Sequence, residues 1–247
     1  MSPSDVFSGF LQVPWGDYMG NIGWGLLRTL AYTIASFAGA ALLGLVLALM
    51  RLNRLRLVRL PAALYTEVFK NVPLLAIIFV TYFGLPSVGV KLSVFAAGVL
   101  SLVLFYAAYL SEIFRAAIAG IHSGQNEAAQ ALGLGRGATF GNVVLPQALR
   151  LALPGTNTMF VDLLKSTSLL VTISAAELMT QAQLIASETF RALEVYLVIA
   201  AIYFAVCYPV SQSLLWLERT IQAGVPLSRG RRRRLRLAKI LLAGGTA

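Results

Sequence analysis

The chain has 247 residues, of which 58% are hydrophobic and only 12% are charged, and its formal net charge at pH 7 is +10. A composition this apolar lies outside the range of soluble globular domains and within that of proteins that cross a membrane several times. The excess of Lys and Arg could indicate nucleic-acid binding, but these residues cluster beside apolar stretches and form no aromatic-interleaved face. Composition therefore predicts an all-α, polytopic membrane protein that contacts membrane lipid and no nucleic acid.

Uncharged stretches of about 20 residues or more recur along the chain, as in 29–50 and 195–217. Because a helix rises about 1.5 Å per residue, such stretches match a hydrocarbon core of about 30 Å. We therefore predict a transmembrane domain over residues 24–220 with five spans. Their predicted ranges are 24–50, 61–85, 93–118, 151–176 and 193–217.

The positions of Lys and Arg predict how the chain is oriented. With the N-terminus outside, most of the 20 basic residues fall on the cytoplasmic side, including Arg51, Arg136 and the Arg-rich tail 221–247. Residues 1–23 then form an external segment. We expect no cleavable signal peptide, because the opening residues lack a charged segment followed by an apolar run. The opposite orientation would break the positive-inside rule.

Three times, an acid precedes a base by three residues inside or at the edge of an apolar stretch. The pairs are Glu67/Lys70, Glu112/Arg115 and Asp162/Lys165. Residues three apart share a helix face, so the members of each pair can meet there. Ionisable groups at membrane depth are costly and usually face a bundle interior or a solute pathway. The pattern therefore predicts a protein that moves something polar.

Asp162 and Lys165 flank the centre of the predicted fourth span, the depth at which transporters commonly hold their substrate. One hypothesis places a zwitterionic amino acid between them, with Lys165 meeting the α-carboxylate and Asp162 the α-ammonium group. Asn157 and Thr158, one turn earlier, would add hydrogen bonds. The alternative is a self-neutralised pair that pins this helix to a partner. The sequence leaves both open because it does not show which way the side chains face.

For the other two pairs we favour structural roles. Glu67 and Lys70 fall in the inner half of the second span, and Glu112 and Arg115 fall near the inner end of the third. Both pairs could brace helices or form part of an inner gate. Pro73 differs in kind, because it removes a helical hydrogen bond and should kink the second span.

A polar stretch, residues 120–150, separates the third and fourth spans and is longer than most loops between bundle helices. Ser123 or Gly124 can begin a helix there. Glu127 falls in its first turn, where an acid suits the helix dipole, and Gly133 can end it. The pattern predicts a short helix of about two turns.

This stretch also carries a motif. Glu127-Ala128-Ala129 is followed after three residues by Gly133, and after nine more by Val143, one residue and Leu145-Pro146. The motif resembles the EAA loop of bacterial ABC-importer permeases, in which this loop forms coupling helices that dock into a groove on the ATPase subunit. The resemblance assigns ATPase coupling to Glu127, Ala128, Ala129, Gly133, Leu145 and Pro146. Without it, the same residues would read as an ordinary interfacial helix.

Segments 67–74, 112–117 and 164–169 extend the resemblance to the polar amino-acid permease family over most of the chain. Importers of that family comprise two permease subunits, identical or homologous, a cytoplasmic ATPase dimer and an external amino-acid-binding protein. The resemblance implies a location in the bacterial cytoplasmic (inner) membrane. Asn71-Val72-Pro73 resembles the glutamate/aspartate branch, which implies an acidic or broadly polar amino acid as substrate.

We expect no catalytic or metal site. His122 is the only histidine and Cys207 the only cysteine, so neither a histidine-activated nucleophile nor a thiolate metal site is indicated. Lys165-Ser166-Thr167 lacks the glycines of a phosphate-binding loop, so ATP and Mg²⁺ are expected in the partner ATPase and not in this chain. Two rival readings are an ion-coupled secondary amino-acid transporter and a membrane enzyme or scaffold.

Overall fold

The computed structural model describes residue 10 and residues 12–223, and every element in this part of the chain is helical, as predicted. The predicted basic tail lies almost entirely outside the described residues. The helices are α2 (Trp15–Leu52), α3 (Arg56–Asn71), α4 (Leu74–Phe79), η1 (Val80–Gly84), η2 (Leu85–Val88), α5 (Val94–Ala119), α6 (Ser123–Ala131), α7 (Arg136–Thr139), η3 (Phe140–Val144), α8 (Leu145–Ser166), η4 (Thr167–Ile173), α9 (Leu178–Thr189) and α10 (Ala192–Ala223).

Among the described residues, α2, α5 and α10 are each long and apolar enough to cross a membrane. Two bent helix pairs raise the number of candidate spans to as many as five, which agrees with the predicted polytopic fold. The third predicted span matches α5 to within a residue. Helix α2, which contains the first predicted span, begins at Trp15 and so includes residues 15–23 of the predicted external segment.

The second predicted span, 61–85, is not one continuous helix. Helix α3 and the segment Leu74–Val88 meet at an angle of 107°. Val72 and Pro73 have extended backbone between them, with ψ values of 131° and 135°. A residue before proline disfavours the helical region, and proline has no N–H to continue the hydrogen-bond pattern. The predicted kink at Pro73 is confirmed, and it is sharp enough to redirect the chain.

The fourth predicted span begins earlier than residue 151. Helices α7, η3 and α8 follow one another with helical backbone at both junctions, so the chain is helical from Arg136 to Ser166. In η3 the N–H of Leu145 bonds to the carbonyl of Phe140, a wider turn of the π type. This turn directly precedes Pro146, whose missing N–H disturbs the ordinary pattern. The part of the polar stretch from Arg136 onward is therefore continuous with the membrane helix.

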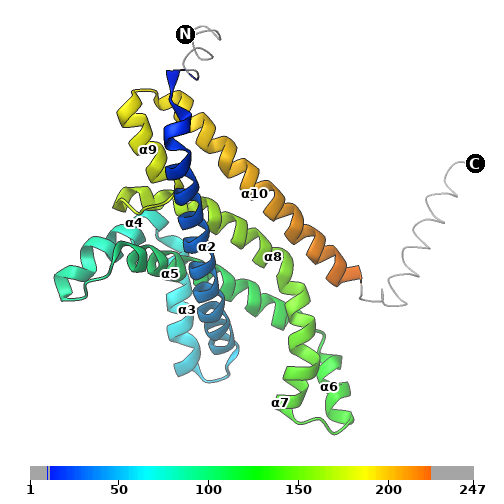
Figure 1. Ribbon diagram of the computed structural model, residues 1–247. Helices are drawn as coiled ribbons and strands as arrows, with labels where there is room; N and C mark the ends of the chain where they lie inside the picture. The colour runs from blue at the N-terminus through cyan, green and yellow to red at the C-terminus, as the bar shows by residue number, and fades with distance from the viewer. Residues whose placement is uncertain (1–9, 11, 224–247) are drawn as a thin grey trace, which may run out of the picture.

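Beyond α8, η4 carries the chain to Ile173, and the axis then bends by 49° into α9. We did not predict α9. Figure 1 shows α9 beside the first turns of α2 and the start of α10, at the end of the molecule opposite to α6 and α7. The buried cluster that joins these three helices includes Ile22, Leu178 and Val195.

The main core lies between α2 and α5, which contact each other at several positions along their length. Gly44 of α2 lies so close to α5 that a methyl group added there would be 2.9 Å from Leu110 Cβ and 3.1 Å from the carbonyl oxygen of Ala107. Small residues of this kind allow membrane helices to approach closely and gain van der Waals contact. The two helices form a tight pair against which α8 packs.

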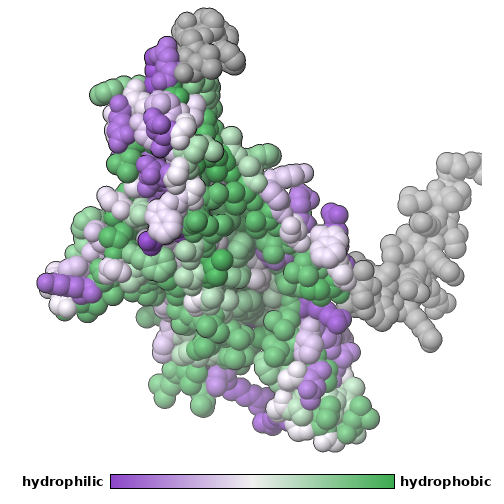
Figure 2. Space-filling view, viewed as in Figure 1, coloured by the Kyte–Doolittle hydropathy of each residue, from purple (hydrophilic) through white to green (hydrophobic). Residues whose placement is uncertain are grey.

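The surface is apolar over the middle of the molecule. Figure 2 shows hydrophobic residues there and hydrophilic residues around α9 and around α6 and α7. Large apolar side chains are highly exposed along the long helices, including Leu42 at 69% and Phe204 at 68%. Patches of this size are rare on soluble monomers and suit contact with lipid or with other membrane helices.

Candidate functional site

A polar cavity of about 210 Å³ lies between α8 and α10. It brings together all four side chains that the sequence proposed for a solute site. From α8 it is lined by Pro154, Asn157, Thr158, Val161, Asp162 and Lys165, and from α10 by Ser211, Leu214, Leu215 and Glu218.

Asp162 and Lys165 do not form the ion pair that their spacing allows. Within the described residues, ion pairs join Glu112 to Arg51 and Arg115, and Glu194 to Arg191. Asp162 is half-buried and accepts a hydrogen bond from the hydroxyl of Tyr106 at 2.8 Å, whereas Lys165 is exposed. The cavity wall therefore carries an acid and a base that are not bonded to each other.

Asn157 and Thr158 make their own hydrogen bonds to backbone. The amide nitrogen of Asn157 donates to the carbonyl of Leu214 at 3.2 Å, which ties α8 to α10. The hydroxyl of Thr158 donates to the carbonyl of Pro154 at 3.0 Å. Thr158 uses its one donor and Asn157 one of its two in this way, and both side chains keep oxygen acceptors. The cavity is thus lined by two carboxylates, those of Asp162 and Glu218, by one ammonium group and by neutral acceptors, groups that can bind the two charges of a zwitterion.

Tyr106 is the residue of this site that sequence reasoning missed. It lies on α5, far from Asp162 along the chain, and is only 1% exposed. Its hydroxyl is 2.8 Å from Asp162 Oδ2 and 2.8 Å from Ser166 Oγ. No spacing rule links an aromatic residue in one span to an acid in another, so only the packing of α5 on α8 could identify it.

Glu112 is enclosed by two guanidinium groups. Arg115, three residues later on α5, pairs with Glu112 at 2.5 Å, and Arg51 from the end of α2 pairs with its other oxygen. The predicted Glu112/Arg115 contact is confirmed. Arg51 was missed as a partner, and its presence makes the cluster a brace between α2 and α5.

Glu67 and Lys70 are not among the ion pairs of the described residues. The side chain of Asn71 donates to the Glu67 backbone carbonyl at 2.7 Å and only weakly to its carboxylate, at 3.5 Å. The Lys70 backbone carbonyl accepts from the hydroxyl of Tyr109 at 3.3 Å. If this segment braces α3 on α5, the link at Lys70 is through backbone rather than charge.

The predicted helix in the polar stretch is α6. The side chain of His122 caps it by accepting from the N–H of Gly124 at 3.1 Å. Because the helix starts at Ser123, Glu127 lies beyond the first turn, and its predicted dipole role is wrong. Gly133 has φ of +81°, which glycine adopts without steric cost, so it ends the helix as predicted.

The exposed face of α6 differs from the sequence expectation in one respect. Glu127 and Ala128 are exposed, but Ala129 is only 3% exposed, so its close approach is to its own chain. Leu132, which we had not singled out, is 82% exposed at the end of the helix.

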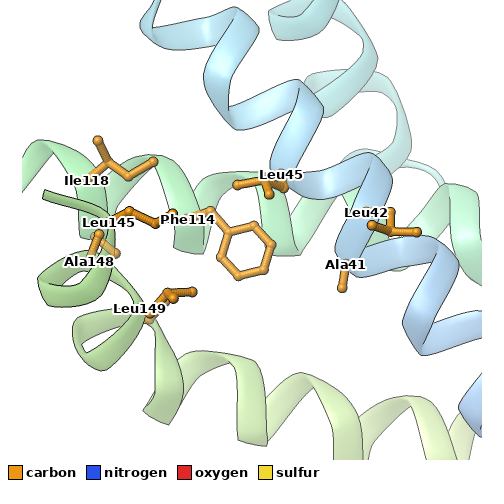
Figure 3. A pocket seen from close by; sticks show the side chains of 10 residues that line it. Ala41, Leu42, Leu45, Phe114, Ile118, Leu145, Ala148 and Leu149 are labelled. Atoms are coloured by element: carbon orange, nitrogen blue, oxygen red, sulfur yellow. The ribbon is translucent and has the colours of Figure 1, made fainter. Parts of the chain in front are cut away.

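Helix α6 is attached to the base of α8. It packs against η3, and the amide of Gln147 donates to the side chain of Gln125 at 3.2 Å. Beside this junction lies an apolar cavity of about 240 Å³ between α2, α5 and α8. Figure 3 shows Leu145 and Leu149 on one side of the cavity and Leu45 on the other, with the ring of Phe114 between them. The first turn of α8 is therefore incompletely packed against α2.

In the described part of the chain, no three His, Cys, Asp or Glu side chains come together in a way that could hold a metal ion. The groups that remain for function are the polar cavity and the exposed face of α6.

Residues 40–223 match the family described as the inner membrane component of binding-protein-dependent transport systems. The chain belongs to this family of membrane transport subunits. The probable amino-acid ABC transporter permease protein YckA of Bacillus subtilis (strain 168) is 38% identical over 183 residues, which cover 74% of this chain and 81% of YckA. The probable glutamine ABC transporter permease protein GlnM of the same organism is 33% identical over 198 residues, which cover 80% of this chain and 92% of GlnM.

Among solved structures, a crystal structure of an amino acid ABC transporter with histidines superposes with a TM-score of 0.78 at 36% sequence identity. The match covers 83% of this chain and 96% of that one. The chain is thus a homologue of amino-acid ABC transporter permeases. It is a multi-pass membrane protein whose role is transport.

Proposed function

We propose that this chain is the permease subunit of an ATP-driven importer for a polar amino acid, located in the bacterial inner membrane. It would form half of the translocation pathway beside a second permease, identical or homologous. An external binding protein would deliver the solute, and a cytoplasmic ATPase dimer would bind ATP and Mg²⁺. The observation that carries the proposal is the polar cavity, because its opposite charges lie on the helix that is continuous from Arg136 to Ser166, and α6 packs against this helix.

In the cavity, Lys165 would bind the α-carboxylate of the amino acid and Asp162 its α-ammonium group. The absence of a bond between these two side chains supports this assignment, since a solute then supplies each with its counter-charge. Asn157 and Thr158 would accept further hydrogen bonds from the ammonium group. A charged side chain that is shielded from water is stabilised by a hydrogen-bonded partner of opposite charge. A zwitterion whose ammonium and carboxylate groups reach both Asp162 and Lys165 would supply both partners at once.

The coupling segment would transmit the force. The exposed Glu127, Ala128 and Leu132 would dock on the ATPase, with Leu132 as the apolar anchor. Because the chain is helical from Arg136 to Ser166, a displacement of α6 would move the start of α8 and, with it, Asp162 and Lys165. Leu145 and Pro146 lie in the first turn of α8, where Leu145 lines the apolar cavity that would leave this helix room to tilt.

The orientation that we propose has the N-terminus outside and the C-terminus in the cytoplasm. It is supported by the positions of Arg51 and Arg56, which lie at the turn between α2 and α3, and of Arg136 on α7. Figure 1 places this turn and α6–α7 toward the same end of the molecule. The exposed face of α6 then lies where a cytoplasmic ATPase can reach it.

The substrate that we propose is a polar amino acid. The sequence motif around Asn71 led us to expect the acidic branch, and that finer assignment remains a prediction. Relatives of this chain include a probable glutamine ABC transporter permease and an L-cystine transport system permease. A site that reads the α-ammonium and α-carboxylate groups accepts any of these, and the binding protein would then set most of the side-chain preference.

The proposal is tested by reconstituting the chain with its ATPase in lipid vesicles and adding the cognate binding protein, titrated with each of the twenty amino acids. We expect uptake that requires ATP and survives an uncoupler. Uptake that persists without the ATPase and collapses with an uncoupler would instead establish an ion-coupled secondary transporter.

The coupling assignment is tested by Glu127→Lys, which should release the ATPase while the permease remains inserted. Glu188→Lys is the matched control, since this exposed acid lies on α9 at the other end of the molecule. Normal co-purification of the ATPase with the Glu127→Lys permease would refute the assignment.

A further inference from the structure

Tyr106 stands between the main core and the polar cavity. It belongs to α5, and it contacts two residues of α8 that are one helical turn apart, Asp162 and Ser166. Both contacts are 2.8 Å and both are made by the same oxygen atom. Tyr106 is only 1% exposed, so it contacts Asp162 of the proposed solute site from the protein interior.

The two contacts must have opposite directions. A phenol hydroxyl has one proton, so Tyr106 can donate only one hydrogen bond. An ionised carboxylate only accepts, so this proton points to Asp162, and the hydroxyl of Ser166 donates to the Tyr106 oxygen. Hydrogen bonds in series polarise one another, which strengthens Tyr106 as a donor. The result is a relay from Ser166 through Tyr106 to Asp162.

The relay orients Asp162 without neutralising it. Within the described residues, Tyr106 is the one side chain that donates to the Asp162 carboxylate, and Asp162 also lines the cavity. A guanidinium or ammonium group in place of the phenol would satisfy the negative charge, as Arg51 and Arg115 do for Glu112. A neutral donor instead leaves most of the electrostatic attraction for a cation in the cavity.

We propose that Tyr106 is a positioning residue for solute recognition: it holds the Asp162 carboxylate in the orientation that receives a primary ammonium group. This inference rests on the function proposed above, in which Asp162 binds the α-ammonium group of an amino acid. It adds that α5, which does not line the cavity, sets the geometry of the site, and that Ser166 supports it as the second member of the relay.

The test uses the complete permease–ATPase complex in lipid and L-glutamine as the probe, with binding measured in the absence of the binding protein. Tyr106→Phe keeps the ring and removes the hydroxyl, and we expect the dissociation constant to rise about tenfold, as for a lost hydrogen bond to a charged group. Ser166→Ala should have a smaller effect in the same direction. Tyr65→Phe is the matched control, because its hydroxyl donates to the Leu104 carbonyl at 2.8 Å and does not touch α8.

A double-mutant cycle separates the positioning role from the site itself. If Asp162→Asn weakens binding and Tyr106→Phe adds nothing to it, Tyr106 acts through Asp162 as proposed. If Asp162→Asn weakens binding but Tyr106→Phe alone leaves it within twofold of the native complex, Tyr106 is only a core residue and the inference is overturned. If Asp162→Asn binds normally, the proposed solute site fails, and the inference fails with it.

A second measurement needs no solute. The infrared band of the Asp162 carboxylate, isolated by difference from Asp162→Asn, should shift in Tyr106→Phe and stay in place in Tyr65→Phe. An unchanged band would overturn the relay, even for a complex that does not bind L-glutamine.

Discussion

The Glu112 cluster and the Asp162 site begin from the same three-residue spacing on a helix and end in opposite arrangements. Glu112 is closed off by Arg115 and by Arg51 of the neighbouring helix. Asp162 is held by a neutral hydroxyl, and Lys165 stays exposed at the cavity. The difference lies in what the neighbouring helix contributes, a guanidinium group in one case and a phenol in the other. Charges that are saturated within the chain brace the fold, and charges left open are available to a solute.

Glu67 and Lys70 provide a third case. They share the spacing, but among the described residues they make no ion pair with each other. Spacing alone therefore does not decide whether an acid and a base meet.

The largest effect should come from Asp162→Asn. The amide keeps an acceptor for Tyr106 and nearly the same volume, so stability should change by less than about 0.5 kcal/mol. Solute uptake should fall about 30-fold, corresponding to about 2 kcal/mol for a lost charge-assisted contact. The measurement is uptake by reconstituted vesicles together with thermal unfolding of the same preparation. Unchanged uptake and amino-acid preference would make Asp162 a structural residue and remove the contrast with Glu112.

Glu112→Gln should lower the stability of the permease and leave solute uptake nearly unchanged, the reverse of Asp162→Asn. Two charge-assisted contacts are lost and two guanidinium groups lose their partner, so we expect a loss of about 2 kcal/mol in stability, moderated because the side chain is a third exposed. Uptake per folded complex should stay within twofold. Thermal unfolding of the purified permease at fixed lipid composition measures the first effect. A stable variant with altered uptake or leakage would identify Glu112 as part of a gate.

Arg51→Met tests how much the guanidinium group from α2 contributes to the stability of the Glu112 cluster. Glu112 keeps Arg115 in this variant, so the loss should be about half that of Glu112→Gln, near 1 kcal/mol. The two variants are compared by thermal unfolding under identical conditions. Equal losses would mean that Arg115 contributes nothing without Arg51.

The smallest effect should come from Glu67→Gln, which makes the same acid-to-amide change at an exposed position. We expect a change in stability within about 0.5 kcal/mol and normal uptake, because this carboxylate has only a weak contact with Asn71. It serves as the reference for the first two substitutions. A loss comparable to that of Glu112→Gln would show that the second pair is engaged in the assembled transporter.

Local features of the fold were the easiest to predict from sequence. The uncharged run that became α5, the proline that breaks the second span and the glycine that ends α6 all act within a few residues of themselves. Proline and glycine determine backbone conformation directly, and an apolar run of sufficient length determines a span. The candidate residues on α8 could be grouped for the same reason, since they recur at helical spacing.

The features that escaped prediction depend on contacts between distant parts of the chain. Helix α9 is short and lies where the sequence shows no long apolar run, and it is held by α2 and α10. The continuity of α7, η3 and α8 depends on a wide turn that accommodates Pro146. Arg51 and Tyr106 are separated from Glu112 and Asp162 by whole helices.

The sequence by itself determined that this chain is an all-helical membrane protein with a motif that resembles the EAA loop and three acid–base pairs, because hydropathy, charge placement and motif spacing are properties of the chain alone. Only the tertiary structure decided which of these acids forms ion pairs within the chain and which does not. That outcome depends on the side chain that a neighbouring helix brings to within hydrogen-bond distance, and a one-dimensional pattern does not contain that distance.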